Sequence, residues 1–175
     1  MSITVGIVED DAGLRKSLTR LISDAPGLLC LAACGSGEEA LQKLPGLKPQ
    51  VVLMDLNLPQ MPGTECIRRL KELTPATQVI VLTVYEDSEH IFLALKAGAC
   101  GYLLKRSDPE EVLDAIQNAR EGGAPMSSQV AHRVVTSFHE PVPSGLDTTA
   151  LTDREKEILT LLSQGFANKE LADKL

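Results

Sequence analysis

The sequence lacks three features that would point to particular classes of protein. It has no excess of positive charge, because 24 acidic residues outnumber 17 basic ones and the net charge is −7. This balance argues against a surface that binds nucleic acid or anionic membrane as a whole, although it leaves room for a local basic patch. No apolar run approaches the roughly 20 residues that span a bilayer, and no basic stretch precedes the apolar start, as a signal peptide would require. We therefore expect a cytoplasmic protein with no membrane partner.

Cysteine pairs of the CxxC type are also absent. The four cysteines are Cys30, Cys34, Cys66 and Cys100. In a protein without an export signal, scattered cysteines are expected to be reduced thiols in the core. Cys30 and Cys34 would lie on one face of a strand, which suits burial better than metal binding.

What the sequence does contain is a regular alternation of strand-like and helical patterns. Short apolar runs cover residues 3–8, 28–34, 51–54, 79–83 and 101–104. Amphipathic stretches that predict helices follow them near residues 14–22, 36–44, 63–73 and 88–97, and from 109 onward. Ser36, with Glu39 three residues later, and Asp108, before a first-turn proline, occupy cap positions. The alternation predicts an α/β fold with one five-stranded, doubly wound parallel sheet covered on both faces.

Polar and charged residues lie at the ends of four of the five predicted strands. They are Glu9, Asp10 and Asp11 after the first strand, Asp55 after the third, Thr83 at the end of the fourth and Lys105 after the fifth. The carboxyl ends of parallel strands meet along one edge of the sheet, where such folds bind their ligands. Taken alone, each residue suits a cap or an ordinary surface position, and Asp11 in particular suits the cap of the first helix. Their joint placement predicts a functional site.

Three carboxylates in one crevice are costly unless a cation neutralises them. Glu9, Asp10 and Asp55 offer a few hard oxygen ligands, which suits Mg²⁺, since this ion keeps several waters and accepts a phosphate oxygen. A carboxylate beside Mg²⁺ can attack a phosphoryl group and form an aspartyl-phosphate. Lys105 would offset charge on the phosphoryl oxygens, and the Thr83 hydroxyl would donate a hydrogen bond to the attached phosphate.

Four motifs carry a family resemblance. They are GIVEDD (6–11), MDLNLPQMPG (54–63), LTVYED (82–87) and AGACGYLLK (97–105). With these motifs in this order and spacing, residues 2–121 resemble the receiver domain of two-component response regulators. The resemblance implies a flavodoxin-like sheet with strand order 2-1-3-4-5.

The resemblance also implies a role for each site residue. Asp55 would be the phospho-acceptor, Glu9 and Asp10 the acidic pair, Asn57 a metal ligand through its backbone carbonyl, Thr83 and Lys105 the phosphoryl-binding residues, and Tyr102 the aromatic switch. Tyr102 would change rotamer as Thr83 moves toward the phosphate. Mg²⁺ would be the cofactor and a sensor histidine kinase the donor, so the protein is expected to be a substrate and not an enzyme. One departure from the family is Arg106, which stands where many receivers have proline.

The C-terminal part predicts a linker and a second, helical segment. Glycines and prolines punctuate residues 122–150, which indicates a linker. Within it, residues 127–138 predict one helix, with Val130, Val134, Val135 and Phe138 as its apolar stripe. Residues 151–175 resemble the first part of a LuxR-type helix-turn-helix domain, as in NarL/FixJ regulators, without the recognition helix that enters the major groove. We expect the full-length protein to bind DNA and regulate transcription, and these 175 residues to show no operator-specific binding in a gel shift.

The residues leave two alternative functions open. One is a Mg²⁺-dependent phosphohydrolase that forms an aspartyl-phosphate, although such enzymes usually carry a second acid where Asn57 stands. The other is a receiver-like interaction module that is never phosphorylated. A phosphorylation-dependent homodimer is a further hypothesis. Val112 and Ile116 lie on one candidate dimer face, although core packing suits these two residues better.

Overall fold

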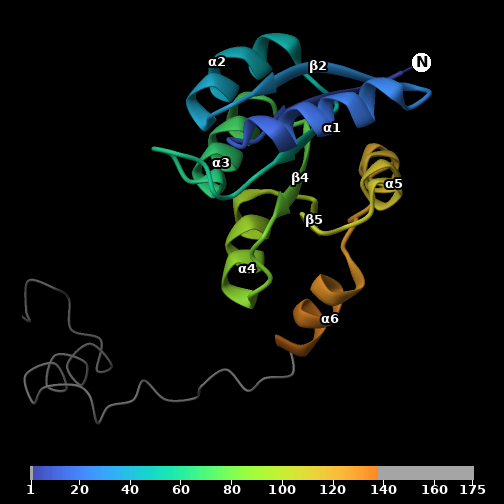
Figure 1. The fold of residues 1–175 in the computed structure, drawn as a ribbon. Helices are drawn as coiled ribbons and strands as arrows, with labels where there is room; N and C mark the ends of the chain where they lie inside the picture. Colours follow the sequence, from blue (N-terminus) through green and yellow to red (C-terminus); the bar gives the residue numbers. More distant parts are fainter. Residues whose placement is uncertain (1, 138–175) are drawn as a thin grey trace, which may run out of the picture. The chain divides into compact units, whose positions relative to one another are not determined.

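The computed structural model describes residues 2–137 and arranges them as one sheet with helices on both sides (Figure 1). The strands are β1 (Ile3–Val8), β2 (Leu28–Cys34), β3 (Val51–Met54), β4 (Gln78–Thr83) and β5 (Gly101–Leu104). The helices are α1 (Ala12–Asp24), α2 (Gly37–Leu47), α3 (Gly63–Leu73), α4 (Ser88–Ala97), α5 (Pro109–Arg120) and α6 (Ser128–Ser137). All strand pairs are parallel and the order is β2-β1-β3-β4-β5, which confirms the predicted fold. The helical segment predicted over 151–162 lies outside the described residues.

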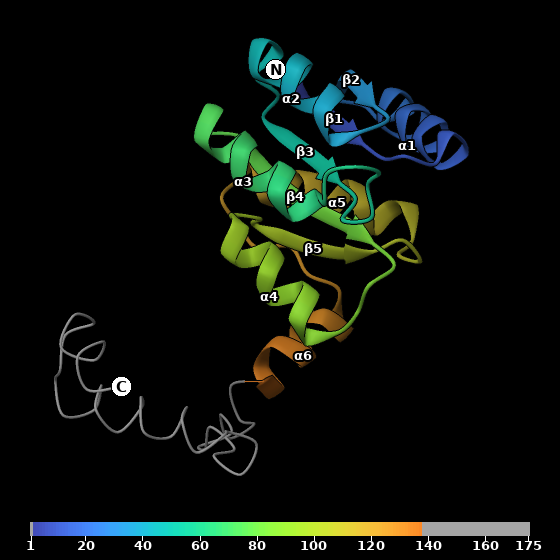
Figure 2. The same cartoon turned by 90° about the vertical axis from the view of Figure 1, so that its left-hand side faces the viewer.

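The central strand β3 shows how the two layers of the core are built. Its side chains alternate, so Val52 and Met54 pack in one hydrophobic cluster, while Val51 and Leu53 pack in the other. All four are at most 1% exposed, as expected for a strand covered on both faces. Helices α1 and α5 cover one face and α2, α3 and α4 the other, as Figure 2 shows from the side. The sheet is therefore a rigid platform whose strand ends hold the polar residues.

The capping pair predicted at the start of α2 is confirmed. Ser36 Oγ accepts a hydrogen bond from the Glu39 amide at 3.2 Å, and Glu39 Oε2 accepts one from the Gly35 amide at 2.7 Å. The end of this helix differs from the prediction, which stopped it at residue 44. It continues through Pro45 to Leu47, and the last turn closes where the Lys48 amide donates to the Leu44 carbonyl.

Two further cap positions have different outcomes. Asp11 caps α1 by accepting a hydrogen bond from the Leu14 amide at 2.7 Å. Asp108 stands at the cap position of α5, but its side chain makes no capping hydrogen bond. The start of α5 therefore depends on Pro109, whose fixed φ suits the first helical position and whose missing N–H needs no partner there.

The helix predicted inside the linker is present as α6, which packs beside α4 (Figures 1 and 2). Val130 is fully buried and Val134 is partly buried against the same hydrophobic cluster as α4. Val135 was predicted to share this apolar stripe, but it is 57% exposed. Residues on one face of a helix are three or four positions apart, and Val135 lies five positions after Val130. Across residues 2–137, no helix is both long and apolar enough to cross a membrane.

The four cysteines are free thiols, and we predict that two of them resist modification in the folded protein. Cys34 and Cys66 are fully buried, and burial raises the pKa of Cys34 to about 11 and that of Cys66 to about 12. Because the thiolate is the reactive form, a maleimide near neutral pH should leave both unmodified for hours. Mass mapping of labelled peptides would check this, with the chain in denaturant as the control in which all four react. Equal labelling of Cys66 in both conditions would contradict the prediction.

Candidate functional site

Three carboxylates meet at the carboxyl edge of the sheet. One oxygen from each of Glu9, Asp10 and Asp55 lies within 4.8 Å of the others. The strand register explains this proximity. Val8 of β1 pairs with Met54 of β3, so the residues that follow them, Glu9 and Asp55, lie side by side. Glu9 is 1% and Asp55 2% exposed, whereas Asp10 is exposed to solvent. The structure therefore brings the predicted acidic residues together, with one side open to water.

Lys105 reaches this cluster from the end of β5. Its Nζ lies 2.8 Å from Glu9 Oε1 and 2.7 Å from Asp55 Oδ2. Burial lowers the pKa of Lys105, but the bonds to Asp55 and Glu9 outweigh burial and raise it above its usual value, so the ammonium stays charged. Burial also raises the pKa of Glu9, by more than the hydrogen bond from Lys105 lowers it. One ammonium thus bridges two buried carboxylates.

Two buried polar atoms in this site have no hydrogen-bond partner among the described residues. They are Asp55 Oδ1 and the hydroxyl oxygen of Thr83, the last residue of β4. Buried polar atoms are nearly always bonded, so such orphans point to a bound group that completes them. Asp55 Oδ1 is an acceptor that suits a cation, and the Thr83 hydroxyl is a donor that suits an anion. This pairing fits a phosphoryl group held beside a metal ion.

The donor set also fits Mg²⁺ by charge. When ionised, three carboxylates against one ammonium leave two negative charges, which a divalent cation balances. Few protein oxygens and an open, solvent-exposed side are the conditions under which Mg²⁺ retains part of its water shell. Asn57 lies in the loop after β3, two residues beyond Asp55, with its side chain exposed.

Arg15 is a site-supporting residue that the sequence reasoning missed. Its Nη1 donates to the carbonyl oxygens of Glu9 at 2.6 Å and Asp10 at 3.0 Å, which holds the loop that carries both acids. A helical side chain leans toward the N-terminus of its own helix. An arginine four residues after the cap residue Asp11 can therefore reach back to this loop. That spacing is the feature of the sequence that could have predicted the role of Arg15.

Tyr102 of β5 is fully buried, and its hydroxyl donates to the Tyr85 carbonyl at 3.0 Å. Burial raises the pKa of Tyr102, so the phenol remains a protonated donor. Tyr85 lies two residues after Thr83, in the loop that leads to α4. The predicted switch residue is therefore hydrogen-bonded to the loop that directly follows Thr83.

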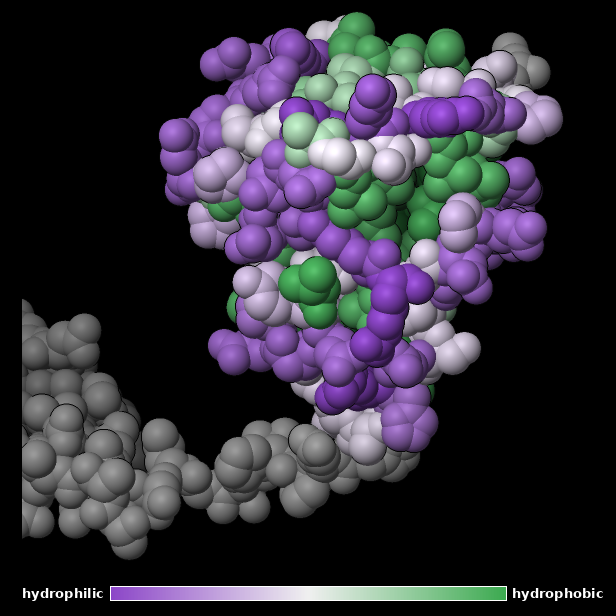
Figure 3. Space-filling view, in the orientation of Figure 1, coloured by the Kyte–Doolittle hydropathy of each residue, from purple (hydrophilic) through white to green (hydrophobic). Residues whose placement is uncertain are grey.

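An apolar hollow of about 220 Å³ opens beside Lys105. It lies between α1 and α5, where Figure 3 shows hydrophobic residues gathered on an otherwise mostly hydrophilic face. Leu14, Leu18 and Leu21 line it from α1, and Val112 lines it from α5. The approach to the acidic site is thus flanked by a surface that an apolar side chain can fill.

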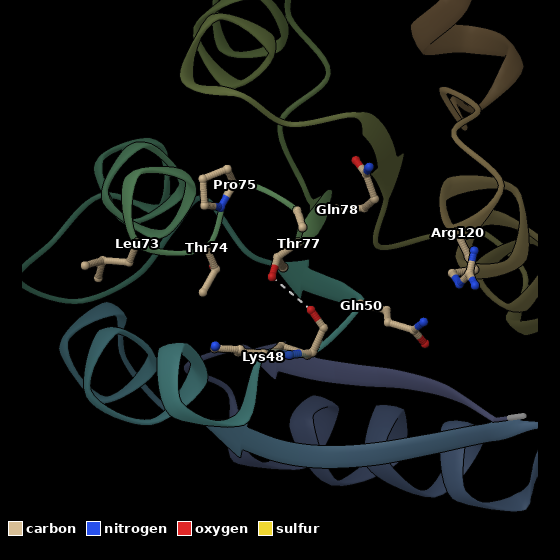
Figure 4. Close-up of a pocket in the computed structure, with 10 residues that line it drawn as sticks. Lys48, Gln50, Leu73, Thr74, Pro75, Thr77, Gln78 and Arg120 are labelled. Atoms are coloured by element: carbon tan, nitrogen blue, oxygen red, sulfur yellow. Dashed lines mark hydrogen bonds between the residues drawn. The ribbon is translucent and has the colours of Figure 1, made fainter.

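A second hollow, of about 460 Å³, lies at the opposite edge of the sheet, where β3 and β4 begin (Figure 4). There the Thr77 hydroxyl donates to the Pro49 carbonyl at 2.9 Å. The Gln50 amide donates to the Thr4 hydroxyl, and the Thr4 amide donates to Gln50 Oε1. These groups bond one another and hold the strand starts together. None of the predicted site residues lines this hollow.

Comparison with known proteins agrees with the geometry. Residues 5–117 match the family model of the response regulator receiver domain, and residues 149–175 match that of bacterial regulatory proteins of the luxR family. The nitrate/nitrite response regulator protein NarL of Escherichia coli K12 is 34% identical over 98% of this chain and 80% of its own length. The transcriptional regulatory protein LiaR of Bacillus subtilis is 32% identical over 99% of this chain and 82% of its own.

A solved structure gives the same result. The crystal structure of a LuxR-family two-component response regulator from Aurantimonas sp. SI85-9A1 superposes with a TM-score of 0.76 at 30% identity. The superposed region covers 80% of this chain and 100% of the chain in that crystal structure. The chain therefore belongs to the two-component response regulators that join a receiver domain to a luxR-family regulatory segment.

Proposed function

We propose that Asp55 accepts a phosphoryl group from a phosphohistidine of a sensor histidine kinase, and that this event controls DNA binding by the C-terminal domain of the full-length protein to regulate transcription. The observation that carries the proposal is the asymmetric Asp55 carboxylate. Lys105 holds Oδ2 at 2.7 Å, while Oδ1 is buried without a hydrogen-bond partner in the described part of the chain. An ionised, fixed carboxylate with one free oxygen is suited to nucleophilic attack.

In the proposed reaction, an Asp55 oxygen forms the O–P bond while the P–N bond to the donor imidazole breaks. Mg²⁺, held by Glu9, Asp10, Asp55 and the Asn57 backbone carbonyl, would supply positive charge to the phosphoryl oxygens. Lys105 exchanges its bond to Asp55 for one to a phosphoryl oxygen, and the Thr83 hydroxyl donates to another. Both donors already stand at the strand ends that adjoin Asp55, so the groups that stabilise the phosphoryl oxygens are in place before the reaction.

The proposed division of the chain is a receiver over 1–121, a linker over 122–150 and the start of a LuxR-type domain over 151–175. The family matches at 5–117 and 149–175 are compatible with it. We also propose that an apolar side chain of the kinase binds in the hollow between α1 and α5, because that hollow adjoins Lys105. The protein would then be a cytoplasmic substrate of the kinase.

A turnover enzyme is the weaker proposal. A phosphohydrolase needs a second acid that protonates the leaving group, and an amide at Asn57, the position where such enzymes usually place that acid, cannot do so. We therefore expect one phosphoryl group per chain and no sustained hydrolysis of phosphate esters. Steady turnover of such an ester would favour the hydrolase.

The test is intact-mass measurement after incubation with acetyl phosphate and Mg²⁺. We expect a gain of one phosphoryl group in the native chain, and no gain in Asp55→Asn or after addition of a chelator. Asp24→Asn is the matched control, because Asp24 is exposed at the end of α1, near the opposite edge of the sheet. Phosphorylation of Asp55→Asn to the level of the native chain would overturn the proposal.

A further inference from the structure

The segment before α6 is joined to the edge strand β5 at Tyr102. The Tyr102 amide donates to the Pro125 carbonyl at 2.9 Å, and the Ser127 amide donates to the Tyr102 carbonyl at 3.3 Å. Met126 forms a parallel bridge with Tyr102 between these two bonds. A Cβ at Gly101 would lie 2.7 Å from the Pro125 carbonyl oxygen, so glycine is what permits this close approach. The linker therefore extends the sheet by one short bridge before α6 begins.

The first turn of α6 packs into the hydrophobic cluster that contains Tyr102. Val130 of α6, Ile91 of α4 and Tyr102 belong to one hydrophobic cluster, and each is fully buried. Met126 and Val134 pack against the same cluster. Figures 1 and 2 both show α6 beside α4. The Tyr102 ring therefore shares its apolar surroundings with α6.

A second set of contacts links α6 to the loop that carries Tyr85. Arg106 Nη2 lies 2.5 Å from Glu86 Oε2 and also bonds Gln129 Oε1 of α6. Arg133 of α6 approaches the other Glu86 oxygen at 3.8 Å. These ion pairs are exposed, so they contribute little energy compared with the buried apolar contacts. Their effect is to fix the position of α6 relative to Glu86, which lies three residues after Thr83.

We propose that α6 is a clasp that holds Tyr102 in its buried position and is thereby coupled to phosphorylation of Asp55. This inference rests on the proposed function. A phosphoryl group on Asp55 draws the unpartnered Thr83 hydroxyl toward it, and the shift is passed to the buried Tyr102 ring through its hydrogen bond to the carbonyl of Tyr85, two residues after Thr83. Docked α6 and phosphorylated Asp55 thus favour the same arrangement. Because such coupling is reciprocal, loss of α6 docking must weaken binding of the phosphoryl group.

The test uses the full 175-residue chain with Mg²⁺ and beryllium fluoride as the phosphoryl mimic. Hydrogen exchange of amides in 128–137 reports α6 docking, and the fluorescence of Tyr85 and Tyr102 reports mimic binding, since the chain has two tyrosines and no tryptophan. We expect the mimic to slow exchange in α6 by about 5-fold or more. Val130→Ser should weaken mimic binding most. Arg106→Ala should weaken it less, because its ion pairs are exposed, and Arg106→Lys should restore part of that loss. His132→Ala is the control, because that exposed ring contacts Thr136 of the same helix.

Circular dichroism separates these effects from unfolding, and Arg106→Ala changes only an exposed side chain. Unchanged α6 exchange on addition of the mimic, together with native affinity in Val130→Ser, would overturn the clasp while leaving the proposed function intact. A native chain that binds no beryllium fluoride would overturn both. The two failures are distinguishable because the first still shows a fluorescence response that Asp55→Asn lacks.

Discussion

Replacing Lys105 with methionine is expected to lower the free energy of unfolding by about 3 kcal/mol at neutral pH, because two buried carboxylates lose their shared counter-charge. Glu9 and Asp55 are at most 2% exposed, and the Lys105 ammonium is the group that bonds both. Partial exposure of the Lys105 side chain, at 19%, keeps the expected cost at the lower end for a broken buried ion pair. Urea unfolding followed by circular dichroism would measure it.

The pH dependence of this cost has a definite sign. Burial already raises the pKa of Glu9 in the native chain, and removal of Lys105 takes away the hydrogen bond that lowers it. The folded-state pKa of Glu9 therefore rises further above its unfolded value. Such a group stabilises the fold below the unfolded pKa and loses that contribution as the pH rises through the folded pKa. The loss of unfolding free energy caused by Lys105→Met should therefore be small at acidic pH and reach its full value at neutral pH.

Mg²⁺ should return much of the lost stability. The variant site carries three carboxylates and no ammonium, so it attracts a divalent cation more strongly than the native site. At about 100 times its dissociation constant, a ligand of the folded state adds about 2.7 kcal/mol. The control Lys96→Met removes an exposed lysine from α4 and should change neither stability nor its Mg²⁺ dependence. A Lys105→Met chain as stable as the native one without Mg²⁺ would contradict the buried ion-pair geometry.

Replacing Gly63 with alanine is expected to be at least as damaging, for a steric reason. A Cβ at this first residue of α3 would lie 2.1 Å from the Asp55 carbonyl oxygen and 2.6 Å from Leu56 Cα. Both are backbone atoms, so no side chain can rotate away. Overpacking of this kind usually costs about 1–3 kcal/mol, and the rigid neighbours put Gly63→Ala at or above the upper end.

The same clash reaches the acidic site, because the backbone that must move is that of Asp55 itself. We expect weaker Mg²⁺ binding in Gly63→Ala, measured by tyrosine fluorescence below the unfolding temperature. The matched control is Gly46→Ala in α2, where an added Cβ meets nothing within 4 Å. Since alanine favours helix over glycine by about 1 kcal/mol, this control should be neutral or stabilising. Native stability and Mg²⁺ affinity in Gly63→Ala would show that the loop after β3 can relax.

Most of the fold followed from local patterns. The bounds of β1, β2, β3, β5, α3 and α4 agree with their apolar runs and amphipathic stretches, because burial on one face or two leaves a direct trace in residue order. The end of α2 was wrong, since Pro45 reads as a stop when only neighbouring residues are considered. The sequence pattern also put Val135 on the buried face of α6, although it is exposed, because local periodicity does not specify what the helix packs against.

For the site, the sequence alone determined that acidic residues, a hydroxyl and a lysine lie at the same end of the sheet. The reason is that the carboxyl ends of all parallel strands point the same way. It also contained the motifs that identify the receiver family. Only the tertiary structure decided that Lys105 bridges Glu9 and Asp55, that the Thr83 hydroxyl is left without a partner among the described residues, and that α6 packs into the hydrophobic cluster that contains Tyr102. Those outcomes depend on side-chain conformations and on contacts between distant segments, which strand order and local periodicity do not specify.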